Sequence, residues 1–167
     1  MIEGMRSLTS TTSATLHVQA SVAPPSSRRL TGLKVMVIDD SNTIRRSAEM
    51  LLKQADCEVI LAEDGFDALQ KISTRQPDII FVDVLMPRLD GYQTCALIKR
   101  SGIYRHIPVV MLTSRDTLFD RARGYAVGSN QHLTKPFTKE TLLRTVEALV
   151  PHKCAAPTTL HNYSEID

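Results

Sequence analysis

Short apolar runs alternate with longer amphipathic segments between Leu33 and Val150. Runs such as Ile79–Val82 and Val109–Leu112 are apolar at every position, as expected for strands that are covered on both faces. The pattern predicts strands over residues 34–38, 58–62, 78–82, 108–112 and 131–134. It predicts helices over residues 42–55, 65–75, 91–101, 116–127 and 138–150.

Helix-capping and turn residues support these boundaries. Ser41 or Asn42 is suited to cap the first helix, Asp64 to open the second, and Gly128 to end the fourth. Five strands that alternate with five helices predict an α/β fold, namely a flavodoxin-like, doubly wound parallel sheet. Strand order 2-1-3-4-5 is the usual solution for such a sheet and places the first strand beside the third.

The two ends of the chain differ from its centre. Ser and Thr account for eleven of the first 31 residues, and no periodic apolar face occurs there. We therefore expect residues 1–31 to form a disordered Ser/Thr-rich arm, with Met5 as an alternative start. Residues 32–150 should form one domain, and residues 151–167 a flexible tail.

Composition excludes several classes of function. The formal net charge of +2 is too small to indicate nucleic acid or a membrane surface as a partner. No apolar stretch approaches the ~20 residues that span a bilayer, so no membrane insertion is expected. The three cysteines have no metal-binding spacing and no secretory signal precedes them, which predicts reduced thiols in a cytoplasmic protein.

Five polar residues follow the ends of predicted strands. Asp39 and Asp40 follow the first strand, Asp83 the third, Thr113 the fourth and Lys135 the fifth. The carboxyl ends of parallel strands meet at one edge of a sheet, which is where open α/β sheets bind ligands. We therefore expect three carboxylates, a hydroxyl and an ammonium to gather at one site.

This set of groups suits a hard cation and a phosphoryl group. Asp39, Asp40 and Asp83 offer oxygen ligands for Mg²⁺ or Mn²⁺, and Asp83 is the best placed carboxylate nucleophile. Lys135 would neutralise phosphoryl charge, and Thr113 would donate a hydrogen bond. The simpler alternative is that Asp40 only caps a helix and that Asp39 is a strand-end acid.

No glycine-rich phosphate loop occurs in the chain. The phosphoryl group should therefore arrive on another protein or on a small donor. A phosphohydrolase of the haloacid dehalogenase type would need an acid two residues after the nucleophile. Leu85 stands at that position, which argues against turnover of free substrates.

The motifs resemble those of response regulator receiver domains: Asp39-Asp40, the segment from Asp83 to Gly91, Thr113-Ser114 and Lys135-Pro136-Phe137. The resemblance implies that Asp83 accepts a phosphoryl group from a histidine kinase and that Asp39 and Asp40 bind the metal. It also implies a metal contact from the Leu85 carbonyl, a switch role for Thr113, a phosphoryl contact from Lys135 and a cis peptide at Lys135-Pro136.

Some segments are similar to a narrower group, the stand-alone receivers of type IV pilus chemosensory systems that control twitching motility. These segments are 64–69, 87–99 and 134–137. We expect a monomer that signals to a pilus or motor protein through the surface built from its fourth helix, fifth strand and fifth helix. A flagellar chemotaxis receiver and a phosphorylation-independent binding module remain alternatives.

One position departs from the family pattern. His132 stands three residues before the lysine, where members of the family usually carry Tyr or Phe. In the family this aromatic residue turns inward on activation. Imidazole can fill such a slot, but protonation near neutral pH would oppose its burial. His132 is therefore either a switch residue or a half-exposed strand residue without that role.

Overall fold

The computed structural model describes residues 30–115 and 117–151. It contains five strands and five helices in strict alternation within that part of the chain. The strands are β1 (Lys34–Ile38), β2 (Glu58–Ala62), β3 (Ile79–Asp83), β4 (Val109–Thr113) and β5 (Gln131–Thr134). The helices are α1 (Asn42–Lys53), α2 (Gly65–Arg75), α3 (Gly91–Arg100), α4 (Leu118–Ala126) and α5 (Lys139–Leu149).

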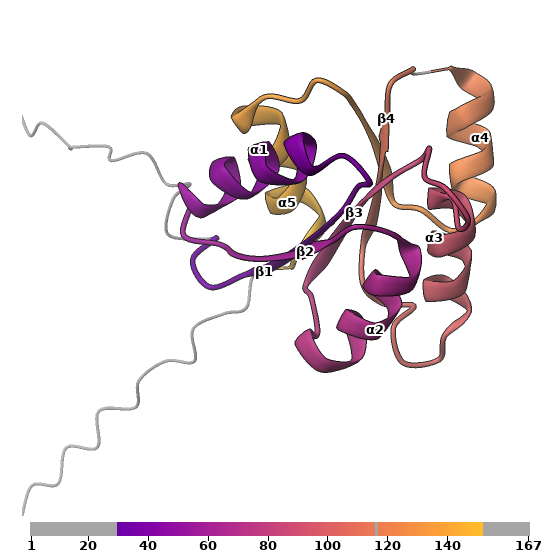
Figure 1. The fold of residues 1–167 in the computed structure, drawn as a ribbon, viewed down its shortest axis with the longest axis horizontal. Helices are drawn as coiled ribbons and strands as arrows, with labels where there is room; N and C mark the ends of the chain where they lie inside the picture. The colour runs from indigo at the N-terminus through magenta and orange to yellow at the C-terminus, as the bar shows by residue number, and fades with distance from the viewer. Residues whose placement is uncertain (1–29, 116, 152–167) are drawn as a thin grey trace, which may run out of the picture.

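All strand pairs are parallel, and the sheet order is β2-β1-β3-β4-β5, as predicted. Helices α1 and α5 cover one face of the sheet, while α2, α3 and α4 cover the other (Figure 1). Because β1 lies beside β3, Ile38 pairs with Val82, and the next residue along each chain segment, Asp39 and Asp83, comes to the same edge.

Each central strand contributes to two cores. Ile80 and Val82 pack with α2 and α3, whereas Ile79 and Phe81 pack with α1 and α5. All four side chains are fully buried, which explains why the central strands are apolar at every position. In the central strands β3 and β4, the polar residues Asp83 and Thr113 stand only at the strand ends.

The predicted boundaries are corrected at a few ends. Strands β3 and β4 include Asp83 and Thr113, because both residues still pair with the neighbouring strand. Helix α4 begins at Leu118, because the hydroxyl of Thr117 caps it. Of the two caps predicted for α1, Ser41 is the one observed, and Asp64 caps α2 as predicted. Gly128 follows α4 with a φ of 88°.

The predicted arm and tail lie almost wholly outside the described residues. Leu30, at the end of the predicted arm, is only 2% exposed and packs in the core beside α1 and α5. Its carbonyl accepts a hydrogen bond from the Cys57 thiol. Within the described part of the chain, no helix combines the length and apolarity that crossing a membrane requires.

Candidate functional site

Asp39 and Asp83 meet at the carboxyl edge of the sheet because they end neighbouring strands. Their exposed fractions are 0% and 4%. One carboxylate oxygen of Asp39 accepts the Ser41 amide at 2.9 Å, and the nearby backbone of Leu85 acts to lower the pKa of the Asp83 carboxyl. Two buried acids are thus held side by side, an arrangement that costs free energy unless positive charge lies between them.

Asp40 completes a group of three acids. Carboxylate oxygens of Asp39, Asp40 and Asp83 all lie within 4.8 Å of one another, with Asp40 on the solvent side. Ser41 rather than Asp40 caps α1, since its side chain accepts from the Ile44 amide. The capping alternative for Asp40 is therefore wrong. The three oxygen donors fit a hard divalent cation such as Mg²⁺ or Mn²⁺, which would be reached from solvent past Asp40.

Lys135 comes to the two buried acids from the end of β5. Its ammonium nitrogen lies 2.8 Å from Asp83 Oδ1 and 3.1 Å from Asp39 Oδ2. The peptide bond between Lys135 and Pro136 is cis, as predicted, and the Lys135 amide donates to the Thr113 carbonyl at 2.8 Å. Lys135 therefore supplies the positive charge that the acids need.

Burial is the largest single influence on the pKa values of both Asp83 and Lys135. Burial raises the pKa of Asp83, and repulsion from Asp39 adds to this rise, while the hydrogen bond from Lys135 only partly opposes it. Burial alone would lower the pKa of Lys135, but the hydrogen bonds and charges of Asp83 and Asp39 raise it overall. Lys135 is thus kept protonated.

Thr113 lies at the same edge and is 5% exposed. Its hydroxyl donates to the Arg115 carbonyl and accepts the Arg115 amide at 3.1 Å. The hydroxyl is therefore bound to its own loop. A hydrogen bond from Thr113 to a group on Asp83 would require its side chain to leave these partners.

The two remaining predicted residues lie at the edges of this arrangement. Leu85 follows Asp83 by two residues; its side chain is 74% exposed, and its backbone lies close enough to act on the pKa of the Asp83 carboxyl. The half-buried His132 lies on the last strand, against Gly124 of α4, and its ring meets the Tyr125 ring edge-on at 6.0 Å between centroids. His132 thus joins β5 to α4, away from the acids.

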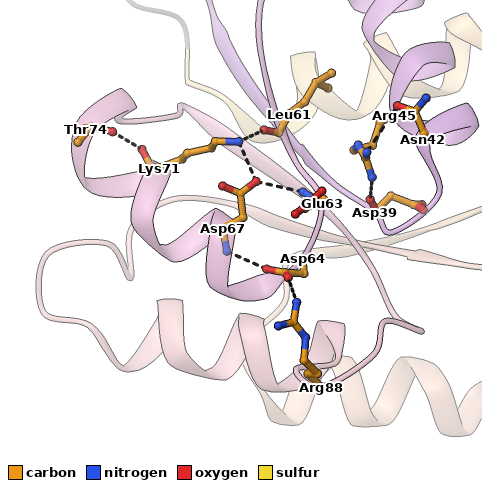
Figure 2. Close-up of polar contacts among 10 residues, drawn as sticks. All are labelled: Asp39, Asn42, Arg45, Leu61, Glu63, Asp64, Asp67, Lys71, Thr74 and Arg88. Carbon is orange, nitrogen blue, oxygen red and sulfur yellow. Dashed lines mark hydrogen bonds and ion pairs between the residues drawn. The ribbon is translucent and has the colours of Figure 1, made fainter.

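Sequence reasoning missed two residues that shape the site. The guanidinium of Arg45, one turn into α1, donates to the Asp39 carbonyl at 2.5 Å and to Asn42 at 3.5 Å (Figure 2). Gly91 begins α3 so close to the end of β3 that a Cβ there would lie 2.2 Å from the Asp83 carbonyl oxygen. The Asp-Gly pair at 90–91 was a detectable signal, whereas nothing local marks Arg45.

The two thiols within the described residues are poorly suited to this chemistry. Cys57 and Cys95 are free and buried, and burial raises the pKa of each thiol to about 11. A thiol with so high a pKa stays protonated at neutral pH and is a poor nucleophile. Cys154 lies outside the described residues.

Known proteins resemble this chain in sequence and in fold. The family model described as "Response regulator receiver domain" matches residues 35–147. Protein PilG of Pseudomonas aeruginosa is 65% identical over 120 residues, which cover 72% of this chain and 89% of PilG. Response regulator MprA of a Mycobacterium species is 36% identical over 118 residues, and the match spans about half of its length, 50%, and 71% of this chain.

Solved structures agree with the sequence comparison. The chemotaxis protein CheY4 of Vibrio cholerae has a TM-score of 0.69 at 35% identity, covering 72% of this chain and 100% of CheY4. A Francisella response regulator receiver domain has a TM-score of 0.65 at 31% identity, with 71% and 96% covered. With the acidic site at the sheet edge, these matches show that the chain belongs to the response regulator receiver domain family.

Proposed function

We propose that this protein is a phosphorylation switch in which Asp83 accepts a phosphoryl group from a histidine kinase. Asp39, Asp40, Asp83 and the Leu85 carbonyl would hold Mg²⁺, and Lys135 and Thr113 would contact the transferred group. The observation that carries this proposal is the position of the Lys135 ammonium between Asp83 and Asp39, beside the third acid.

The reaction transfers a phosphoryl group from a histidine nitrogen to a carboxylate oxygen of Asp83. An Asp83 carboxylate oxygen attacks the phosphorus of a phosphohistidine, the P–N bond breaks, and the released imidazole takes a proton. The product is an acyl phosphate. Asp39, Asp40 and Asp83 would hold a divalent cation that, when bound, would offset part of the charge on the phosphoryl oxygens. Lys135 neutralises more, since its pKa is held above the ordinary lysine value.

The transferred group must then change a surface. Thr113 must give up its hydrogen bonds to Arg115 in order to reach a phosphoryl group on Asp83. Because Arg115 leads directly into α4, this rearrangement would move the start of that helix. Exposed apolar side chains on α4, Leu118 at 86%, Phe119 at 74% and Tyr125 at 64%, support a protein partner for the face built from α4, β5 and α5.

The test is acid-stable, base-labile labelling by a small phosphodonor in the presence of Mg²⁺. Wild-type protein should incorporate one phosphoryl group, and Asp83→Asn should incorporate none. Persistent labelling of Asp83→Asn would overturn the assignment of the acceptor. A steady-state assay with an aryl phosphate should show no turnover, since Leu85 supplies no general acid.

We further propose that the output is type IV pilus control and hence twitching motility. The support is the 65% identity to PilG together with the similarity of segments 64–69, 87–99 and 134–137 to pilus receivers. The likeness to CheY4 favours flagellar chemotaxis as the second candidate. Deletion of the gene should abolish twitching but leave swimming intact, and Asp83→Asn should fail to restore twitching. Restoration by Asp83→Asn would favour a phosphorylation-independent binding module.

A further inference from the structure

The loop from Val84 to Asp90 connects the proposed acceptor to α3, and its middle has few anchors. Val84 and Met86 are buried, but Leu85 is 74% exposed. The Val84 amide donates to the Leu112 carbonyl at 2.9 Å, and the Gly91 amide to the Val84 carbonyl at 3.1 Å. These bonds fix the two ends of the loop and leave its tip to be held by other contacts.

Arg88 lies at that tip in an unusual backbone conformation. Its φ of 67° is in the left-handed region, which residues other than glycine rarely adopt. Its guanidinium forms an ion pair with Asp64, the N-cap of α2 (Figure 2). The guanidinium also lies over the Phe66 ring, 5.8 Å from the ring centroid. The side chain therefore crosses from the loop to the first turn of α2.

Asp64 is suited to hold both elements at once. Asp64 is only 8% exposed. One of its carboxylate oxygens accepts the Asp67 amide at 2.8 Å, and the other binds the Arg88 guanidinium. Leu89, the next loop residue, packs over Gly65, where a Cβ would lie 2.6 Å from Leu89 Cδ2. Two consecutive loop residues thus dock on the same turn of α2.

We propose that Arg88 is a positioning residue: its ion pair with Asp64 ties the loop to α2 and so holds the peptide groups of Leu85 at the acidic site. This inference rests on the proposed function, in which the Leu85 carbonyl contacts the metal ion. The Leu85 backbone, which acts to lower the pKa of the Asp83 carboxyl, belongs to the same loop. Arg88 does not touch the acids itself and acts only through the backbone.

Two substitutions separate this role from general stability. Arg88→Gln removes the cation, and Asp64→Asn removes its partner's charge while keeping a side chain that caps helices well. Arg75→Gln is the matched control, because Arg75 forms a partly exposed ion pair with Glu58 at 2.9 Å, away from the loop. Arg88→Lys should impair the loop less than Arg88→Gln does, since lysine retains the positive charge.

The readouts are hydrogen exchange of residues 84–91 in metal-free protein and Mg²⁺ affinity by titration calorimetry. Arg88→Gln and Asp64→Asn should each speed exchange and weaken Mg²⁺ binding by about two- to five-fold, the range expected of a partly exposed ion pair. The double variant should be no worse than either single variant, because both remove one interaction.

Unchanged exchange and affinity in Arg88→Gln would overturn the proposal, and so would an equal effect of Arg75→Gln or additive effects in the double variant. The proposed function fails separately. If wild-type protein took no phosphoryl label, Asp83 would lose its role, while loop exchange and Mg²⁺ affinity would still decide whether Arg88 positions the loop.

Discussion

The ammonium nitrogen of Lys135 lies 2.8 Å from one carboxylate oxygen of Asp83, and the same nitrogen reaches Asp39 at 3.1 Å. One cation is therefore shared by two acids whose side chains are 6% and 1% exposed. Each acid raises the pKa of Lys135 against the effect of burial. The three residues form one electrostatic unit, and removing any one of them changes the charge balance of the others.

Lys135→Met should destabilise the metal-free protein. The substitution leaves two buried carboxylates without a cation, and the loss of one partner of a buried ion pair costs about 3 kcal/mol in unfolding free energy at neutral pH. Urea denaturation gives this quantity directly. Lys53→Met is the control, since Lys53 is 60% exposed in its pair with Glu49 and should cost about 0.5 kcal/mol or less. Equal losses in the two variants would show that the buried ion pairs of Lys135 stabilise the protein no more than the exposed pair of Lys53.

Asp83→Asn should raise the thermal stability of metal-free protein near pH 7. The pKa of Asp83 is raised in the folded state, chiefly by burial and then by Asp39. The folded state therefore binds the proton more tightly than the unfolded state, and the stability from this group is lost as pH rises through the folded pKa. Above that pH, ionised Asp83 is a cost that asparagine lacks.

Melting temperatures measured from pH 3 to pH 8 test this sign. The difference between Asp83→Asn and wild type should be smallest below the ordinary aspartate pKa of ~3.9 and should widen as pH rises. A difference that is constant with pH would mean that shape, rather than charge, decides the effect.

Asp40→Asn should weaken metal binding with little effect on the rest of the site. Asp40 is the exposed member of the three acids, whereas Asp39 and Asp83 also hold Lys135. A ligand at 100 times its dissociation constant stabilises the folded state by about 2.7 kcal/mol. At the Mg²⁺ concentration that gives this gain in wild type, Asp40→Asn should gain well under half as much. A full gain in Asp40→Asn would place the metal elsewhere.

The sheet and the acidic site could be predicted because both depend on local patterns. Apolar runs gave the strands, and the polar residue after each run marked the edge where Asp83 and Lys135 meet. The same rule placed two strand ends one residue early. Asp83 and Thr113 are polar yet still pair within the sheet, since their backbone groups are satisfied there even though their side chains face the site.

The supporting contacts could not be predicted, because they join residues that are distant in sequence or depend on rotamers. Arg88 reaches Asp64 across 24 positions, and no periodicity links the two residues. Arg45 holds the carbonyl of Asp39 rather than its carboxylate, so charge pairing would not have found it. The Thr113 hydroxyl was expected to face a phosphoryl group, but its bonds to Arg115 show that its direction is set by the loop.

His132→Tyr should change the affinity for the output partner without changing phosphoryl labelling. The His132 ring packs against Gly124 so closely that a Cβ there would lie 2.2 Å from it. We therefore expect the larger tyrosine ring to displace α4 and alter its surface. Pull-down of the partner by phosphorylated protein should change by about five-fold, or about 1 kcal/mol. Equal recovery by both variants would assign His132 no part in output.

Gly91→Ala should damage the acceptor end of β3. A Cβ at residue 91 would lie 2.2 Å from the Asp83 carbonyl oxygen and 2.9 Å from the Val84 Cα, and both are backbone atoms that cannot rotate away. We expect a loss of about 3 kcal/mol in unfolding free energy, as for other overpacked buried sites. Gly102→Ala is the control, because a Cβ there meets nothing within 4 Å and should change stability by about 0.5 kcal/mol or less. If Gly91→Ala were as stable as Gly102→Ala and took the phosphoryl label at the wild-type rate, the close approach of α3 to Asp83 would have no role in holding the acceptor.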